Sequence, residues 1–304
     1  MKKIFFVLSA LALVIGMGSC QKDEPKLTDN TLVVTASLNN GAATKVTYTE
    51  VSSPQTGLKG TWVKTTDKLY GLWKESGSSN WNQITFTCSD VKDGMGYFTV
   101  SSGTAPSDGA TVNVVYAGSR TVNISQNKAT LSFDPQEGKL ESIGKYIVLW
   151  ATATVSNGKL HFDFQPAVSV LKMNLKTTNN PKSGKVYVVL KHITNSITVN
   201  FEATTFDEAF TIVPVTTSDV KTKIYLTADT NNNISTTPKE FYAVIPAAPG
   251  GTNHSVLELN VCKSYDGSSV GTDYGRSQDG TAFYAGKFII IGANDPMVLQ
   301  YSGN

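Results

Sequence analysis

The first residue whose position suggests chemistry is Cys20, which closes the run Met17-Gly18-Ser19-Cys20 after an apolar stretch. A short basic start at Lys2 and Lys3, an apolar core and small residues before a cysteine are typical of an exported lipoprotein, whose cysteine is acylated. The apolar core spans about a dozen residues, well short of the roughly 20 that a membrane-spanning helix needs. We therefore predict that residues 1–19 are removed and that acyl chains on Cys20 anchor the protein outside the cytoplasm. Two alternatives are a signal peptide in which Cys20 is incidental and a retained membrane helix.

A second pattern, Gly267-Ser268-Ser269-Val270-Gly271, matches the G-x-S-x-G turn of serine hydrolases. That turn needs a helix after the serine, whereas residues 272–280 are turn formers without helical period, so we interpret the segment as a long hairpin loop. The loop aspartates, Asp266, Asp273 and Asp279, match no defined calcium-loop spacing, and the three histidines are dispersed. The sequence thus predicts no catalytic residue, no metal site and no cofactor.

The elements that position these residues are predicted to be strands, because nearly every apolar run alternates with period two. In residues 32–38, Leu32, Val34, Ala36 and Leu38 alternate with Val33, Thr35 and Ser37. Similar runs recur in residues 84–88, 97–100, 111–117, 145–155, 159–164, 168–176, 185–193, 197–203, 220–227, 240–245, 255–261 and 283–291. The best helical candidate is the short stretch 205–210. We predict an all-β fold made of β-sandwiches.

We expect four regions: a lipoprotein signal peptide at 1–19, a flexible linker at 20–30, an N-terminal β-sandwich domain at 31–156 and a C-terminal β-sandwich domain at 157–304. The joint between the domains is the polar run Ser156-Asn157-Gly158-Lys159, although a hairpin turn inside one domain would have the same sequence.

Charge and cysteine content exclude further classes of function. Removing Lys2 and Lys3 from 26 basic residues leaves 24, equal to the 24 acidic residues, so the mature chain is formally neutral. A neutral chain lacks the basic surface that binds nucleic acid. After Cys20, only Cys88 and Cys262 remain; they are 174 positions apart, and we interpret them as two buried thiols, with a disulfide as the alternative.

Tryptophans offer a different binding chemistry, because exposed aromatic rings can stack on sugars. Trp62 and Trp73 lie in strand-like runs and are predicted to be core residues, whereas Trp81 follows a polar loop and is predicted to be exposed. One exposed tryptophan gives the alternative function of a glycan-binding outer-membrane lipoprotein.

Several segments together resemble the fimbrillin family of Bacteroidales, the lipoprotein-derived pilins. They are a first strand at 32–38, the step Thr44-Lys45, a tryptophan segment with an aspartate turn at 62–70, and strands at 160–176, 241–246 and 285–291. Thr66 stands where the family usually has a glycine before the aspartate. The acidic run Gln21-Lys22-Asp23-Glu24 also resembles the export signal of surface lipoproteins in Bacteroidetes. This resemblance implies display on the cell surface, with a lipoprotein that faces the periplasm as the alternative.

The resemblance implies two tandem transthyretin-like β-sandwich domains and a role as a structural, anchor or tip subunit of a pilus in cell adhesion. In such pilins a protease removes the first strand, and a strand from a neighbouring subunit replaces it. Stalk subunits are typically cut after an arginine, but no arginine precedes Arg120 here, so Lys45 and Lys59 are the candidate cleavage sites for a lysine-directed protease. The alternative is that the chain stays whole and lipidated, as expected of an anchor or a non-polymerising relative.

The resemblance also implies partners: other pilus subunits or further copies of this chain, the outer-membrane lipid reached through Cys20, and host or bacterial surface ligands. The tail offers a second strand, because Met297, Leu299 and Tyr301 alternate. This strand is either a donor for a neighbour or the last strand of its own sheet.

Overall fold

The fold is built almost entirely from strands, as the period-two pattern predicts. The computed structural model describes residues 32–38, 49–51, 57–177, 187–191, 195–212, 223–226, 236–247, 252–262, 274–283, 288–291 and 296–301. Within these ranges the helices are one turn, α1 (Phe206–Ala209), and a short 3-10 helix, η1 (Leu140–Lys145). No helix in the described ranges is long and apolar enough to cross a membrane. The all-β prediction is confirmed.

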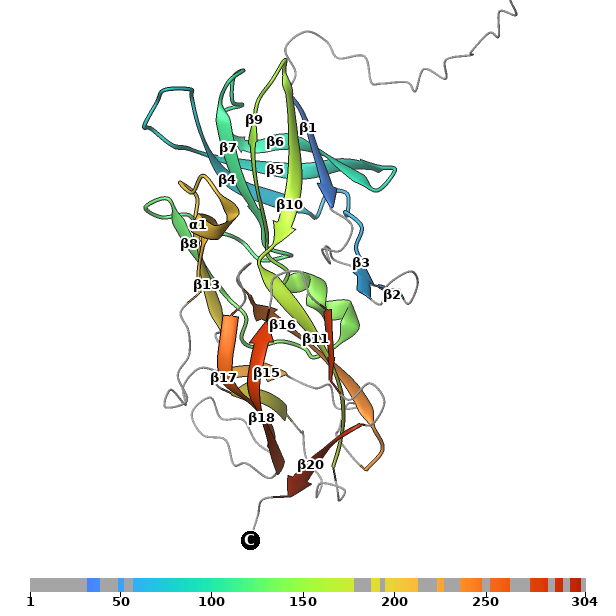
Figure 1. Cartoon of the computed structure of the whole chain (residues 1–304). Coiled ribbons are helices and arrows are strands. Elements are labelled where there is room, and N and C mark those ends of the chain that lie inside the picture. Colours follow the sequence, from blue (N-terminus) through green and yellow to red (C-terminus); the bar gives the residue numbers. More distant parts are fainter. Residues whose placement is uncertain are drawn as a thin grey trace, which may run out of the picture. The chain divides into compact units, whose positions relative to one another are not determined.

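The first sheet closes on itself. Its strands neighbour one another in the order β1-β10-β9-β7-β4-β5-β6, and β6 pairs with β1 again. Their bounds are β1 (Val33–Leu38), β4 (Lys68–Lys74), β5 (Asn82–Lys92), β6 (Met95–Gly103), β7 (Thr111–Tyr116), β9 (Leu149–Thr154) and β10 (Lys159–Pro166). All these pairs are antiparallel except β1 with β10, which is parallel (Figure 1). A closed sheet has no free edge, so each strand has a neighbour on both sides.

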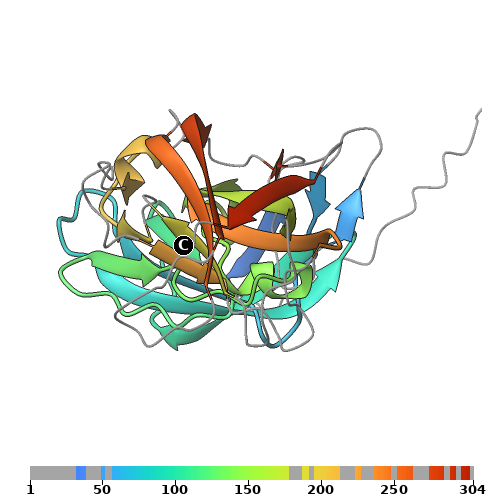
Figure 2. The same ribbon diagram turned by 90° about the horizontal axis from the view of Figure 1, so that it is seen from below.

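The second sheet carries the C-terminal strands, drawn from yellow-green to red in Figure 2. Its order is β15-β12-β17-β18-β20-β11-β16, and β19 pairs with β11. The bounds are β11 (Val168–Thr177), β12 (Tyr187–Lys191), β15 (Lys223–Leu226), β16 (Lys239–Pro246), β17 (Thr252–Cys262), β18 (Tyr274–Phe283), β19 (Phe288–Ile291) and β20 (Met297–Tyr301).

Two smaller sheets complete the described structure. One has the order β14-β13-β8, with β8 (Lys128–Ser132), β13 (Ser196–Asn200) and β14 (Phe210–Thr211). The other is an isolated ribbon of β2 (Thr49–Val51) and β3 (Gly57–Lys59). In the chain β8 lies between strands of the first sheet and β13 between strands of the second, so the β14-β13-β8 sheet ties the two parts of the chain together.

A buried asparagine fastens this small sheet to the closed sheet. Asn113 on β7 donates from Nδ2 to the carbonyls of Phe201 and Ala203, at 2.7 and 2.9 Å. The next residues form α1, where the Glu208 N–H donates to the N-cap hydroxyl of Thr205. The helix that the sequence predicts at 205–210 is therefore present as one turn, and its N-cap is a threonine, a residue type preferred at that position.

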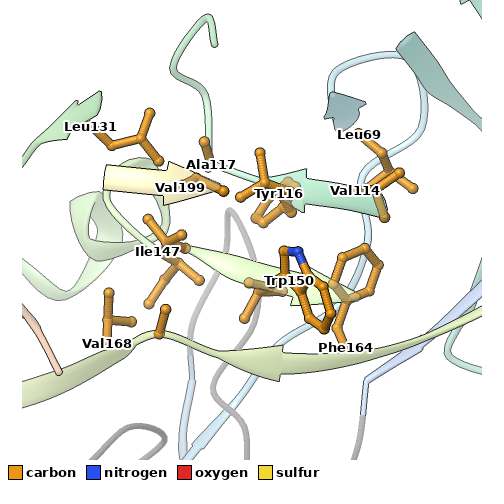
Figure 3. Packing of buried hydrophobic residues seen from close by; sticks show 14 of the residues in the cluster. Leu69, Val114, Tyr116, Ala117, Leu131, Ile147, Trp150, Phe164, Val168 and Val199 are labelled. Atoms are coloured by element: carbon orange, nitrogen blue, oxygen red, sulfur yellow. The ribbon is translucent and has the colours of Figure 1, made fainter. Parts of the chain in front are cut away.

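The core consists of large apolar side chains on the inward faces of the strands. Figure 3 shows Leu69, Val114, Tyr116, Trp150 and Phe164 together with other buried residues of this cluster. Cys88 continues the inward face of β5 and is fully buried and free, as predicted. Burial, reinforced by the nearby Asp67 carboxylate, raises the pKa of the Cys88 thiol to about 11.

The structure corrects two sequence-based interpretations. Residues 274–280, read as part of a long loop, belong to β18, which pairs with β17 over nearly its whole length. Backbone hydrogen bonding to a long neighbouring strand does not depend on side chains, so it overrides the turn preference of these residues. Strand β8, which pairs with β13, has no counterpart among the predicted runs.

The predicted domain joint forms a tight turn. Ser156 pairs with Lys159, and Asn157 and Gly158 both have positive φ, the geometry that Asn-Gly turns favour. The turn joins β9 to β10, and both strands belong to the closed sheet. The division into domains 31–156 and 157–304 stays a prediction, while membership of the sheets changes at Ala167, between β10 and β11.

Candidate strand-exchange site

Strand β1 lies between two strands that are distant from it in the chain. It pairs in parallel with β10 from Val33↔Lys159 to Leu38↔Phe164 and antiparallel with β6 from Val34↔Phe98 to Ala36↔Gly96. In the described sheet β6 and β10 do not pair with each other, because β1 lies between them and closes the ring. Taking β1 away would therefore open a groove with unpaired backbone groups on both sides.

The inward face of β1 is small and fits closely against aromatic rings. Val34 and Ala36 are 2% and 0% exposed. The Trp62 indole donates from Nε1 to the Ala36 carbonyl at 3.2 Å. Its ring centroid lies 5.2 Å from that of Phe98 and 5.7 Å from that of Phe164. The rings form a wall against which only short side chains of β1 pack.

Glycine at position 96 is required by this wall. A Cβ atom added to Gly96 would lie 2.7 Å from the Phe98 ring and 2.8 Å from the Trp62 indole. Gly96 is directly opposite Ala36 in the β6 ladder. Where β1 and β6 pass the Trp62 indole, the two facing residues are therefore an alanine and a glycine.

An aspartate turn holds Trp62 in place. The buried Asp67 carboxylate accepts a hydrogen bond from the Val63 N–H at 2.5 Å and one from the Tyr116 hydroxyl at 3.0 Å. Burial, followed by the charge of Asp67, raises the pKa of Tyr116, so this hydroxyl keeps its proton and donates. Trp62 and Asp67 belong to the segment that carries the family resemblance, and the structure places both in the support of β1.

The outward face of β1 is polar and is bonded to β10. Thr35 Oγ1 lies 2.8 Å from His161 Nδ1, and the Ser37 hydroxyl donates to Asp163 Oδ1 at 2.5 Å. His161 Nε2 lies 3.4 Å from the same Asp163 oxygen. Both hydroxyls of β1 are thereby matched to a partner on β10 at the same level of the parallel register.

The predicted maturation residues are only partly within the described chain. Cys20 and Lys45 lie outside the described residues. Lys59 ends β3 and pairs with Thr49 in the β2-β3 ribbon, which has no ladder to another described strand. Cleavage at Lys45 or Lys59 stays a prediction.

Arg120, the first arginine of the chain, is partly buried, and its side chain binds three backbone segments. Its guanidinium donates to the carbonyls of Ala117 at 3.0 Å, Ser132 at 2.7 Å and Tyr146 at 2.9 Å. The Phe133 ring lies 4.8 Å from the guanidinium carbon. Burial lowers the pKa of Arg120 to about 10. Arg120 thus joins three chain segments, a role that its sequence neighbourhood did not indicate.

The tail residues Met297, Leu299 and Tyr301 lie on β20. This strand pairs in parallel with β11, from Leu175↔Met297 to Thr177↔Leu299, and antiparallel with β18 at Tyr274↔Tyr301. The structure therefore shows β20 as a strand of its own sheet. A donor role for the tail stays a prediction, and the structure does not bring these residues to the β1 site by any described pairing.

The tryptophans do not form an exposed platform. Trp62, Trp73 and Trp150 are buried, and Trp81, predicted to be exposed, is only half-exposed, with Lys74 Nζ 4.7 Å from its ring centroid. The geometry of the described tryptophans gives the glycan-binding alternative no support.

The remaining motifs are not assembled into a site by the described structure. The hydrolase-like run 267–271, Asp266 and Asp273 lie outside the described residues, and Asp279 lies on β18. Among the described residues no three His, Cys, Asp or Glu side chains are grouped to hold a metal ion.

Comparison with known proteins shows that solved structures share the fold of this chain. No protein-family model and no curated protein matches the chain. A crystal structure from Bacteroides ovatus, described as a "putative cell adhesion protein", matches 89% of this chain and 95% of its own, with 15% identity and a TM-score of 0.50. A structure with the same description from Bacteroides uniformis has 14% identity, coverage of 89% and 96%, and a TM-score of 0.49.

A third similar structure is the fimbrial anchor protein Mfa2 from Porphyromonas gingivalis, with 8% identity, coverage of 76% and 77%, and a TM-score of 0.37. The match to the Bacteroides ovatus protein shows a shared fold over most of both chains. The resemblance to Bacteroidales fimbrillins predicted from the sequence is confirmed at the level of the fold.

Sequence reasoning identified β1 but missed the residues that shape its groove. Gly96 lies just before the predicted strand run 97–100, and His161 and Asp163 look like solvent-facing residues of an alternating strand. Alternation assigns a residue to a face but not to a neighbour. A parallel pairing between residues 33–38 and 159–164 has no local signal in the sequence.

Proposed function

We propose that this protein is a surface-exposed lipoprotein of fimbrillin type that acts without catalysis as a structural subunit of an adhesive pilus. In this proposal Cys20 carries the lipid that anchors the precursor to the outer membrane. The partners are other pilus subunits, and the assembled fibre contacts host or bacterial surfaces. Tandem transthyretin-like sandwiches, and a position as stalk, anchor or tip, belong to the same proposal.

The observation that supports assembly is the position of β1. It is the first described strand, it closes the ring between β6 and β10, and its inward side chains complete an aromatic core. A cut after Lys45 or Lys59 would separate β1 from the rest of the chain. The open groove would then offer backbone donors and acceptors and an apolar floor, which an incoming strand satisfies by β-strand addition.

In this proposal β1 stays bound in its groove after the cut, which prevents assembly until a suitable donor strand replaces it. Backbone ladders on both sides and buried side chains hold the strand without a covalent link. A donor strand must supply equivalent interactions, so exchange is favoured only when a matching subunit is present.

Mass spectrometry of the native protein tests this proposal. We expect two forms on cells: a full-length chain that starts at an acylated Cys20, and a fibre-incorporated chain that starts just after Lys45 or Lys59. Isolated fibres that contain only the full-length lipidated chain would refute assembly by loss of β1. A chain that starts at an unmodified residue before Cys20 would refute the lipid anchor.

A further inference from the structure

We infer that the β1 groove selects donor strands that carry a small residue at the Ala36 position between outward hydroxyl residues, a pattern that this chain's own strand β20 lacks. The inference rests on the proposed function, because it requires that β1 can be replaced. It adds the chemistry of the partner: a strand, from another subunit, whose inward residues are short and whose outward residues hydrogen-bond with β10.

The small-residue requirement follows from what surrounds Ala36. Ala36 is fully buried, with Phe162 beside it in the β10 register and Gly96 beside it in the β6 register. The Trp62 indole already lies too close to Gly96 for a Cβ there, and it donates to the Ala36 carbonyl. A larger side chain at this position would have to displace rings that are themselves buried.

The Trp62 indole also explains why the groove would select the residue at the Ala36 position by its size. Its bond to the Ala36 carbonyl is available to any incoming backbone, so it adds affinity without choosing a sequence. The ring that makes this bond is in edge contact with Phe98 and Tyr116, at centroid distances of 5.2 and 5.4 Å. Because the ring is in contact on two sides, a longer residue would have to displace it together with Phe98 or Tyr116.

The outward requirement follows from His161 and Asp163. These β10 side chains lie opposite Thr35 and Ser37 and bond with their hydroxyls at 2.8 and 2.5 Å. An incoming strand with apolar residues at both positions would lose two side-chain hydrogen bonds. Hydroxyl residues at the same spacing restore both bonds in the parallel register.

The tail strand does not meet the first requirement. Residues 297–301 are Met, Val, Leu, Gln and Tyr, and none of them is smaller than valine. Whichever of them takes the Ala36 position, a side chain larger than a methyl group meets the Trp62 wall. We therefore expect the donor to be a strand other than β20.

Peptide exchange tests the inference on the full chain. A recognition sequence for a specific protease is inserted between Leu38 and Thr49, the chain is cut, and labelled peptides are added at increasing concentration. The peptides are residues 32–38, the same peptide with Ala36→Leu, its small-residue control with Ala36→Gly, a hydroxyl-free peptide with Thr35→Val and Ser37→Ala, and residues 296–302. Fluorescence anisotropy reports binding.

We expect the peptide of residues 32–38 to bind, the Ala36→Gly control to bind within a few-fold of it, and Ala36→Leu to bind at least about tenfold more weakly. The hydroxyl-free peptide should bind several-fold more weakly. The tail peptide should bind no better than Ala36→Leu. Equal binding of Ala36→Leu and the original peptide, or tight binding of the tail peptide, would overturn the inference and leave strand exchange intact.

Failure of every peptide, including residues 32–38, to enter a cut protein that stays folded by circular dichroism is a different outcome. It would refute replacement of β1 itself and therefore the proposed function. Because the changes that test selection are made in the peptide, a folding defect of the protein cannot mimic either result.

Discussion

Replacement of Arg120 with methionine should destabilise the fold, because one partly buried guanidinium joins three segments of the chain. It donates to carbonyls at the end of β7, at the end of β8 and just after η1. Methionine keeps most of the apolar volume but supplies no donor. The Ala117 carbonyl is buried but also accepts the Arg120 backbone N–H, whereas Ser132 is exposed and Tyr146 is half-buried. Each lost side-chain hydrogen bond therefore costs about 0.5–1 kcal/mol.

The loss is partly offset, because burial of a charge is itself unfavourable, as the lowered pKa of Arg120 shows. We therefore expect a decrease of about 1–2 kcal/mol in the free energy of unfolding. At about 2–4 °C per kcal/mol for a chain of this size, Tm should fall by roughly 2–8 °C. Arg120→Lys should give an intermediate loss, since one ammonium group cannot reproduce the planar fork.

Thermal and urea unfolding followed by circular dichroism measures this effect. The matched control is Lys128→Met on β8, an exposed lysine whose replacement should change the free energy of unfolding by no more than about 0.5 kcal/mol. If Arg120→Met proves as stable as the control, the guanidinium does not link these segments as argued.

Three further predictions follow from buried contacts. Cys88 should resist alkylation at pH 8 in the native protein and react only in denaturant, because it is fully buried and its pKa is about 11; site-resolved mass spectrometry that finds rapid native labelling contradicts this. Gly96→Ala should lower the free energy of unfolding by about 1–3 kcal/mol, because the added methyl group overpacks the core. Thr99→Ala, at an exposed position on the same strand, should have little effect. Equal urea midpoints for the two variants would show that the Trp62 and Phe98 rings move to make room. Asn113→Ala should speed hydrogen exchange in residues 201–212, and unchanged exchange there would show that its two bonds do not hold this segment.

The sequence predicted the elements of this fold better than their partners. Alternation located β1, β7, β10 and β11, because one buried face leaves a period-two pattern. It missed β18, whose Gly, Ser, Asp and Gln residues look like a loop until β17 pairs with them. Local preference fails there because the ladder is a property of two distant segments.

The candidate site shows the same division. The sequence indicated the first strand by its alternating apolar residues and the Trp62–Asp67 segment by its tryptophan and aspartate turn. That β1 lies parallel to β10, with Ala36 between Phe162 and Gly96, depends on how the ring closes. Long-range closure of this kind leaves no trace in a single window of sequence.

The most direct test of the account is a structure of the assembled fibre that resolves the strand between β6 and β10. We predict a strand from a neighbouring subunit there, parallel to β10, with a small inward residue at the level of Phe162 and Gly96. A fibre in which each subunit keeps its own β1, continuous with the rest of its chain, would contradict it.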